Sequence, residues 1–496
     1  MPATLSRFVL RAWLFLSLCA STLPALAQQT VGLFFNDGAY PGYNLFSPNR
    51  GTGTYLVDND GNLIKQWIDP DGYSPGASTY LTERGTLLKS CFVDVGYFPP
   101  QGAGAGRGGM IREYAWDPDS NGKAVVIWQY LYNTENVLQH HDFKRLPNGN
   151  ILITAWEKNV DYPGNWEHLI EVKPNYSNWD NSSLPAHGVG GTIVWEWHLL
   201  DHLIPEGEDS KDYPSKWDPE NGAPRINAVQ YDPKLNQILI SSNNEIWIIK
   251  KFTTIDLYLY KLYQKLFTRI FGNFFGEVLL SQLFSEPGDL LYRWGDPATY
   301  LGADTSHPQT SFFQHGVGWI DRFTEFGYKI PKGKGVGNIL FLNNQFPAGS
   351  SVQEFTPPLR RNGSYTQPAY GEPFEPSGLV WQYNTVIEGG LPPAPFLGSA
   401  QRLPNGNTLI GAGPSGACIE VTNDRTIVWK YIVPVANLSP TTPGPKSFDD
   451  LVLGLTDPVS PQTNMPFRIK RYAPTYRGFS GKDLSPQGEL IGALPE

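Results

Sequence analysis

The chain has 496 residues, enough for two or three ordinary domains or for one large repeat domain. Its formal net charge is only −9 and it has no run of Lys or Arg, which argues against a nucleic-acid-binding surface. The 51 Gly, 43 Pro and 13% aromatic residues favour short strands joined by turns over long helices or disorder.

The first residues have the three parts of a secretory signal peptide. Arg7 and Arg11 precede an apolar run at 12–20, and an A-x-A cleavage site ends at Ala27. The apolar run is too short to span a bilayer. We therefore expect residues 1–27 to be removed and the mature chain to be exported, to the periplasm or out of the cell.

A short apolar run that ends in Trp recurs six times. These runs are 63–67, 125–128, 193–195, 290–294, 379–381 and 427–429. A second strand-like run precedes each one, and most are followed by a third and a fourth run joined by turns such as Pro147-Asn148-Gly149. Four short strands repeated six times predict an all-β fold, a six-bladed β-propeller of four-stranded blades over residues 28–496.

We name the strands of a blade A to D from the axis outward, with the Trp-ended runs as D. The Trp side chains are then expected in the core, packed between neighbouring blades. The chain begins with B, C and D runs at 43–48, 54–58 and 63–67, and it ends with an A-like run at 467–472. Pairing of 467–472 with 43–48 would complete one blade and close the ring, which removes exposed sheet edges.

Two cysteines follow the expected cleavage site, Cys91 and Cys418. The blade assignment puts Cys91 after strand B of the second blade and Cys418 on strand C of the sixth. The closing blade stands between them, too far for a disulfide. We expect two free, buried thiols.

One segment, residues 252–287 in the fourth blade, fits no strand. Its apolar residues recur at spacings of three and four, with Lys261, Lys265 and Arg269 on one stripe, which predicts an amphipathic helix broken near Gly272. Such an insertion can cap the propeller's own surface, contact a partner or a second copy, or lie on a membrane surface.

The starts of the A strands are expected around the mouth of the central channel. The polar residues at these starts are His140, His141, Arg225, Asn227, Gln314, His315, Ser399 and Arg402. Together they form a plausible anion site. Strand alternation would point His140 and His141 to opposite faces.

Metal binding receives no support from the spacing of the histidines. His198 and His202 are four residues apart, but no third ligand has a suitable spacing, so we expect a solvated loop and no metal. No other cofactor is implied.

Several segments together resemble the arylsulfotransferase family. They read HHDFKRLPNGNILITAWE, IVWEWHLLDHL, GDLLYRWGDP, QHGVGWI and SAQRLPNGNTLI, in the family's order. The resemblance implies an exported propeller. It also implies transfer of a sulfuryl group from a phenolic sulfate ester to another phenol, through a sulfated histidine and without a nucleotide cofactor.

Residue by residue, the resemblance is partial. His315 after Gln314 matches the family's Gln-His pair, and Asn227 matches the Asn of its His-x-Asn motif, whose His is Arg225 here. The family residue that takes up sulfate lies in a later blade, yet no histidine follows His315, and an Arg expected near 343–345 is missing.

Two functions of different classes remain. As an enzyme, the chain would use His315 as nucleophile or acid, with Arg225 and Arg402 holding the sulfate and His141 and Asn227 as supports. A phenolic or sulfated small molecule would then be the substrate. As a non-catalytic propeller, the chain would bind an anionic or glycan ligand at the channel mouth, or dock a partner through its insertion.

Overall fold

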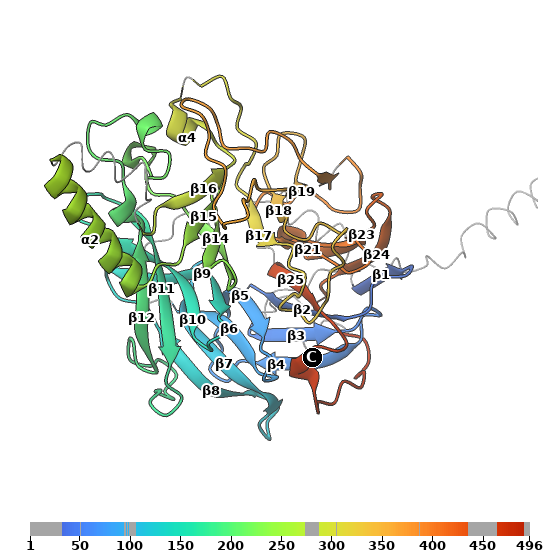
Figure 1. Ribbon diagram of the computed structural model, residues 1–496. Helices are drawn as coiled ribbons and strands as arrows, with labels where there is room; N and C mark the ends of the chain where they lie inside the picture. The colour runs from blue at the N-terminus through green and yellow to red at the C-terminus, as the bar shows by residue number, and fades with distance from the viewer. Residues whose placement is uncertain are drawn as a thin grey trace, which may run out of the picture. The chain divides into compact units, whose positions relative to one another are not determined.

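The computed structural model shows antiparallel sheets arranged in a ring (Figure 1). The structure describes residues 32–49, 51–93, 96, 98, 106–272, 287–303, 305–385, 387–434 and 464–490. The predicted signal peptide, residues 1–27, lies outside the described residues.

The strands are short and evenly spaced along the chain. They are β1 (Gly32–Asn36), β2 (Tyr43–Pro48), β3 (Gly53–Val57), β4 (Leu63–Ile68), β5 (Pro75–Leu81), β6 (Leu87–Phe92), β7 (Gly109–Pro118), β8 (Ala124–Leu131), β9 (Val137–Arg145), β10 (Ile151–Lys158), β11 (Asn165–Pro174), β12 (Gly191–His198), β13 (Ile226–Asp232), β14 (Gln237–Ser242), β15 (Glu245–Lys250), β16 (Leu290–Trp294), β17 (His315–Trp319), β18 (Ile339–Asn343), β19 (Ser351–Phe355), β20 (Trp381–Asn384), β21 (Ser399–Arg402), β22 (Thr408–Ala412), β23 (Ala417–Val421), β24 (Ile427–Ile432) and β25 (Pro466–Tyr472).

The described strands form six sheets, and each sheet is one blade. The first blade is β25-β2-β3-β4, and the next four are β5 to β8, β9 to β12, β13 to β16 and β17 to β20 in chain order. The sixth is β21 to β24, with β1 added at its outer edge as a fifth strand that the sequence did not predict. The predicted six-bladed propeller is confirmed.

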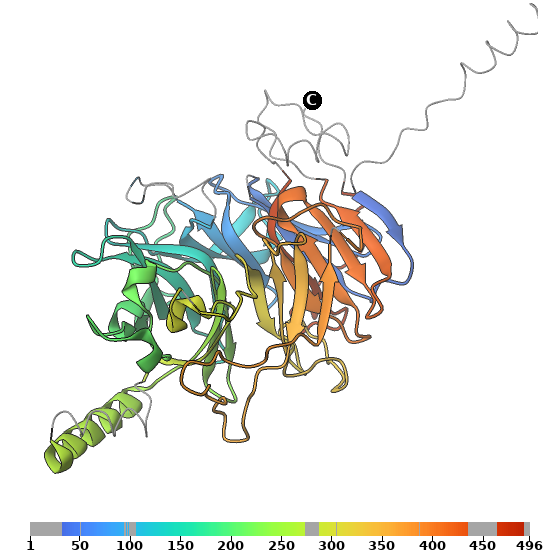
Figure 2. The ribbon, with the colours of Figure 1, turned by 90° about the horizontal axis from the view of Figure 1, so that it is seen from above.

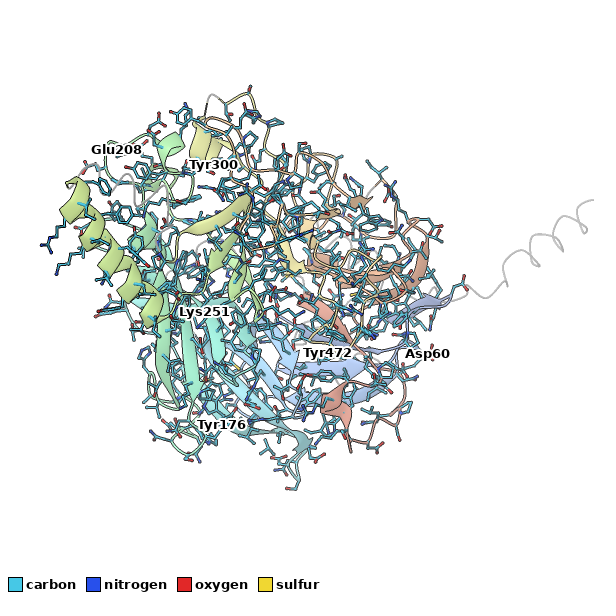
Figure 3. The ribbon with its side chains drawn as sticks, in the orientation of Figure 1. Asp60, Tyr176, Glu208, Lys251, Tyr300 and Tyr472 are labelled. Carbon is cyan, nitrogen blue, oxygen red and sulfur yellow. The ribbon has the colours of Figure 1, made fainter. Side chains whose placement is uncertain are left out.

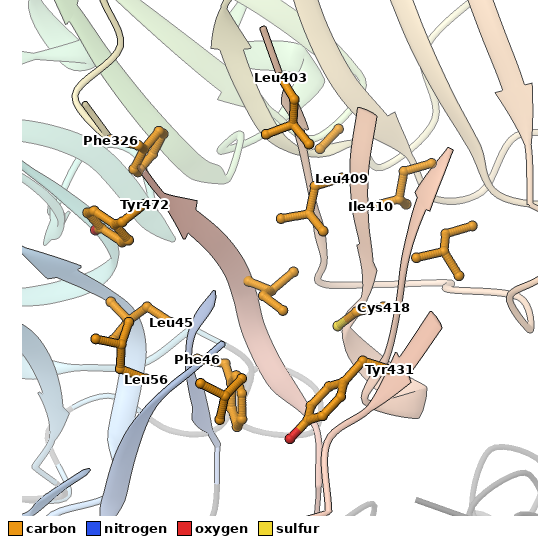
Figure 4. Packing of buried hydrophobic residues seen from close by; sticks show 14 of the residues in the cluster. Leu45, Phe46, Leu56, Phe326, Leu403, Leu409, Ile410, Cys418, Tyr431 and Tyr472 are labelled. Carbon is orange, nitrogen blue, oxygen red and sulfur yellow. The ribbon is translucent and has the colours of Figure 1, made fainter. Parts of the chain in front are cut away.

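The ring closes as predicted, because β25 pairs antiparallel with β2. Tyr472 lies opposite Tyr43 and Ile469 lies opposite Phe46 in this pairing. Figure 4 shows the apolar core on both sides of β25, where side chains of the first and sixth blades meet. An ion pair between buried Arg471 of β25 and buried Glu420 of β23 joins the same two blades.

A tryptophan on each outer strand donates its indole N–H to a backbone carbonyl of the next blade. The six bonds are Trp67 to Ala115 (3.0 Å), Trp128 to Gly190 (2.7 Å), Trp197 to Gly288 (2.8 Å), Trp294 to Pro376 (2.9 Å), Trp381 to Asn423 (3.0 Å) and Trp429 to Asn59 (2.8 Å). All six side chains are buried. Packing of these residues between blades is confirmed for five of the six predicted tryptophans.

The third blade differs from the prediction, because Trp197 makes the contact there and Trp195 does not. The two residues are two apart on β12 and therefore share a face. Trp195 is half-buried and packs against Phe252, 5.4 Å between ring centroids, and its indole nitrogen has no hydrogen-bond partner in the described structure. In the fifth blade the strand begins at Trp381, where the sequence predicted its end.

The insertion contains the predicted helix, α2 (Thr254–Phe271). It begins with a capping box between Thr253 and Asp256. It ends before Gly272, near the predicted break. No residue of α2 is buried, and Figure 2 shows it projecting from the sheets. Figure 3 places Lys251 where the insertion leaves the fourth blade.

The helix exposes several large apolar side chains, which are Ile255, Tyr258, Leu259, Leu262, Tyr263, Leu266, Ile270 and Phe271. Residues 273–286 of the predicted insertion lie outside the described residues. The other helices that the structure describes are short: α4 (Ala298–Leu301), η1 (Leu199–His202), η2 (Ser210–Asp212), η3 (Pro219–Asn221), η4 (Gly413–Ser415) and η5 (Arg477–Phe479). None of the described helices has the length and apolar character needed to cross a membrane.

Cys91 and Cys418 are free and buried, as predicted. Cys91 lies within β6 rather than after it, and Cys418 lies in β23, so they belong to the second and sixth blades. Burial raises the pKa of both thiols, that of Cys418 to about 12, so the reactive thiolate is disfavoured at both positions.

Candidate functional site

The innermost strands bring polar residues to the ring's axis, and local irregularities set the directions of their side chains. The pairing register of the inner strand shifts in five blades, at β5, β9, β13, β17 and β25. In β9 the irregular residue is His141, whose φ of 41° is rare for a residue other than glycine. Strain of this kind often marks functional sites.

The irregularity brings His140 and His141 together, so the expected placement on opposite faces is wrong. Their Nδ1 atoms are 2.8 Å apart. The other nitrogen of His140, Nε2, lies 3.1 Å from a carboxylate oxygen of Glu167, and its ring stacks on Trp156 at 4.3 Å. All four side chains are buried.

These contacts indicate which nitrogen of each ring carries the proton. Nε2 of His140 donates to the Glu167 carboxylate, so in the neutral ring Nδ1 accepts and Nδ1–H of His141 donates to it. Nε2 of His141 faces Gly106 so closely that a Cβ there would lie 1.9 Å away. Only glycine fits at this position, and its backbone covers the ring of His141.

His315 begins β17 and is held by a different set of acceptors. Its Nδ1 lies 2.8 Å from Oδ1 of Asn344 and 3.2 Å from the carbonyl oxygen of Phe313. The Asn344 amide nitrogen donates to the carbonyls of Ala394 and Leu397, which fixes Oδ1 as the atom that faces His315. His315 therefore carries its proton on Nδ1 and its lone pair on Nε2.

Both axial histidines are neutral at pH 7. Burial lowers the pKa of His315 to about 4, and the positive charges of Arg468 and Arg225 act in the same direction. Burial, and then the neighbouring His140 and Arg225, hold the pKa of His141 well below its ordinary value. A neutral imidazole keeps the lone pair that a nucleophile needs.

Phe467, at the start of the closing strand β25, lies between the two histidines. Its ring centroid is 6.1 Å from that of His141 and 6.3 Å from that of His315. The next residue, Arg468, lies with its guanidinium 4.7 Å from the Phe467 ring centroid. Arg225 lies over Trp156 at 5.7 Å. His141, His315 and Arg225, which the sequence predicted to cluster, thus share one electrostatic environment.

Arg468 is anchored by three partners from three blades. Its Nη1 lies 2.8 Å from a carboxylate oxygen of Asp142 and 2.6 Å from the hydroxyl of Tyr80, and its Nη2 donates to the carbonyl of Asn227 at 2.8 Å. Tyr80 also donates to Asp142 at 2.8 Å. The charge of Arg468 is therefore fixed beside the histidines by a rigid network.

Three further predicted residues serve to position the site. Asn227 donates to the carbonyl of Gln314 at 2.6 Å, directly before His315. The side chain of Gln314 itself is held by the hydroxyl of Ser311 and by the carbonyl of Glu245. The Ser399 hydroxyl bonds the backbone of Ile469 at 3.0 Å. All three side chains bond to the protein itself.

Arg402 lies elsewhere, although the sequence predicted it in this ring. It is the last residue of β21, three residues and about 10 Å beyond Ser399. Its guanidinium pairs with Glu354 of the fifth blade, bonds the carbonyl of Gly406 and stacks over Trp381 at 4.9 Å. Arg402 thus joins two blades and does not face the histidines.

A small cavity of about 40 Å³ lies next to Arg402. Its lining includes Gly316, Arg402 and Lys470 but none of the histidines. The polar residues of the inner-strand starts were predicted to line one cavity, and this cavity is a different one. It is lined by residues that lie further along the inner strands.

The residues missed by sequence reasoning lie beside those it found. Asp142 follows the two histidines, and Asn344 lies in the segment 343–345 where the family's arginine was missing. Arg225 was predicted because it lies at the start of an inner strand. Arg468 lies at the start of the closing strand β25, so the same criterion would have identified it.

Residues 48–254 match the family model described as Arylsulfotransferase (ASST). This match confirms the resemblance to the arylsulfotransferase family. Within this propeller, His140, His141, Arg225 and Asn227 fall inside the matched residues, and His315 and Arg468 lie beyond them.

Solved structures similar to this chain are distant. A protein of unknown function from Bacteroides caccae has 11% identity and a TM-score of 0.41, covering 87% of this chain and 99% of that chain. A catalytically inactive virginiamycin B lyase from Staphylococcus aureus with quinupristin has 11% identity and a TM-score of 0.33, covering 82% and 89%. No curated protein matches the chain.

Proposed function

We propose that this arylsulfotransferase-like propeller transfers a sulfuryl group from a phenolic sulfate ester to a phenol, with Nε2 of His315 as the nucleophile. The observation that carries the proposal is the hydrogen bond from Nδ1 of His315 to Asn344, 2.8 Å between the two atoms. It places the proton on one nitrogen and leaves the lone pair on the other.

The chemistry balances in two steps. In the first, Nε2 attacks sulfur, an S–N bond forms, and the bond between sulfur and the phenolic oxygen breaks, so that the phenolate leaves with the electron pair. In the second, the oxygen of the acceptor phenol attacks sulfur, the S–N bond breaks, and its electrons return to Nε2. The acceptor's proton neutralises the departed phenolate through solvent.

The surroundings of His315 suit this reaction. Negative charge develops on the sulfate oxygens and on the leaving phenolate, and cations near these atoms lower the barrier. Arg468 is fixed close to His315 by Asp142 and Tyr80, and Arg225 lies in the same cluster. Because its pKa is about 4, His315 stays unprotonated over the physiological range.

A steady-state assay with an aryl sulfate donor and a phenol acceptor tests the proposal. We expect His315→Ala to abolish transfer and Arg225→Ala to raise KM for the donor more than it lowers kcat. His307→Ala is the matched control, because His307 is partly exposed and pairs with Glu372 outside the cluster. Transfer by His315→Ala at the parent rate would contradict the proposal.

A binding-only function is favoured by one observation, the extent to which Arg468 is engaged by Asp142, Tyr80 and Asn227. A propeller of this kind would hold an anionic ligand without transferring a group. Donor binding measured by calorimetry, without any turnover in the same preparation, would support this second function over the first.

We also propose that the chain works outside the cytoplasm. The support is the charged, apolar and A-x-A pattern that ends at Ala27. Mass spectrometry of the protein isolated from its host should show a mature N-terminus at Gln28, and an intact N-terminus would contradict export by cleavage.

A further inference from the structure

The outer part of the third blade holds a compact cluster of two histidines and a glutamate. Glu157, His168 and His198 each offer a ligand atom, and these atoms lie within 4.8 Å of one another. They come from three adjacent strands, β10, β11 and β12. Residues on separate strands have no fixed spacing in the sequence, so no motif signals this cluster.

The strand register places the three side chains on one face of the sheet. His168 pairs directly with His198, and it also pairs with Ala155, two residues from Glu157. Direct and diagonal cross-strand neighbours on one face lie within reach of each other. The histidine rings stack at 4.1 Å between centroids, and Nδ1 of His198 lies 2.9 Å from Glu157.

His168 provides an independent sign that a ligand belongs here. Its side chain is only 3% exposed, yet neither ring nitrogen has a hydrogen-bond partner among the described residues. The nearest acid to Nε2 is Glu196, 3.7 Å away, which is beyond hydrogen-bond distance. Buried polar atoms without partners are rare in folded proteins, and a bound ion is one explanation for such atoms.

We propose that Glu157, His168 and His198 bind a divalent transition-metal ion of the zinc type. Imidazole and carboxylate are ligands that Zn²⁺ takes at about 2.0–2.2 Å, which puts two ligand atoms at most about 4.4 Å apart, so a small rotation of the side chains closes the cluster on an ion. Glu196 or water would complete the coordination. His198 is 32% exposed, which gives the ion an entry path.

The protonation states fit this role. Burial and the neighbouring His198 lower the pKa of His168 to about 3, so its ring is a neutral ligand at any working pH. Burial works against a charge on His198, but the hydrogen bond that its Nδ1 donates to Glu157, together with the charge of Glu157, outweighs burial and raises the pKa of that ring.

The proposed metal site and His140 contact opposite faces of the same sheet. Trp156 and Glu167, the neighbours of Glu157 and His168 in sequence, face the other side of the same sheet and contact His140. An ion would therefore stiffen the strands that carry the partners of His140.

Zinc titration of the purified, untagged full chain by calorimetry tests the proposal. We expect one Zn²⁺ per chain. For Glu157→Gln and His198→Ala we expect a loss of affinity greater than the roughly 10-fold to 100-fold that follows from removing a residue hydrogen-bonded to a metal ligand. Both positions are partly exposed, so the variants should fold, which their thermal midpoints without metal will verify.

His307→Ala is the control, since the His307–Glu372 pair, 3.6 Å apart, has no third ligand in the described structure. It should bind zinc as the parent does. Zinc should raise the melting temperature of the parent and of His307→Ala but not of His198→Ala. A parent chain that binds no zinc, or that binds it no more tightly than Glu157→Gln and His198→Ala, would overturn the proposal.

Discussion

Nδ1 of His315 lies 2.8 Å from Oδ1 of Asn344, and the amide nitrogen of Asn344 is held by two backbone carbonyls. This arrangement orients the ring without touching the atom proposed to react. Asn344 is therefore a positioning residue, and its role can be separated from that of His315.

Replacement of Asn344 by Ala should lower kcat for sulfuryl transfer by roughly 10-fold to 100-fold, since a lost hydrogen bond to a buried group costs about 1–3 kcal/mol. KM should change little, because Asn344 is not expected to contact substrate. Initial rates over a range of donor concentrations separate the two constants. An unchanged kcat would show that Asn344 does not position His315 for catalysis.

The low pKa of His315 makes stability depend on pH. The unfolded chain takes up a proton near pH 6.5, while the folded chain takes it up only near pH 4. The free energy of unfolding should thus fall as the pH drops from about 6.5 to about 4, by about 3 kcal/mol for this residue. Urea unfolding of the parent and of His315→Asn measures the difference.

In His315→Asn the loss of unfolding free energy that His315 causes between pH 6.5 and pH 4 should be absent. His307→Asn, at a partly exposed position, serves as control and should keep it. Parallel curves for the parent and His315→Asn would show that His315 is not buried in its neutral form.

The tryptophans of β12 offer a matched pair for testing the contacts between blades. Trp197→Phe removes an indole N–H that bonds Gly288 at 2.8 Å, and we expect a loss of about 1–3 kcal/mol in the free energy of unfolding. Trp195→Phe removes an indole nitrogen that has no hydrogen-bond partner among the described residues, so its cost should be near zero. Equal losses in the two variants would argue against the bond as a link between blades.

The closing strand is linked to the sixth blade by the buried pair of Arg471 and Glu420. Arg471→Met leaves a buried carboxylate without its cation and should cost about 3–5 kcal/mol. Adding Glu420→Gln removes that charge and should restore part of the stability. Denaturant unfolding of the four proteins of this double-mutant cycle gives the coupling, and simple additivity would contradict a direct link.

Much of the fold follows from local patterns. The recurrent Trp runs, the Asn-Gly turns and the unpaired run at 467–472 carry enough information to predict six blades and their closure, because each blade repeats the same four-strand pattern. Strand β1 escaped prediction because it adds to an edge without a repeat partner in sequence.

The site was predictable only in part. His315, His141 and Arg225 follow from the starts of the inner strands. Alternation failed for His140 and His141, because a φ of 41° at His141 interrupts it. Arg402 was placed wrongly, since on a strand of only four residues it lies at the end opposite Ser399.

The cluster of Glu157, His168 and His198 was beyond sequence reasoning for a different reason. Its residues meet only through the register of three strands, one of them separated from the others by a long connection. The solvated loop expected for His198 and His202 is wrong: His198 is the last residue of β12, and His202 is buried in η1 and bonded to Asp289 at 2.8 Å.

The central claim is that His315 carries the sulfuryl group. Brief incubation of the protein with an aryl sulfate alone, followed by rapid acid-free digestion and mass spectrometry, tests it most directly. The account predicts a sulfated peptide that contains His315, and this peptide should lose its sulfate when a phenol is added before digestion. Transfer that proceeds with the sulfate on another residue, or that persists in His315→Ala, would contradict it.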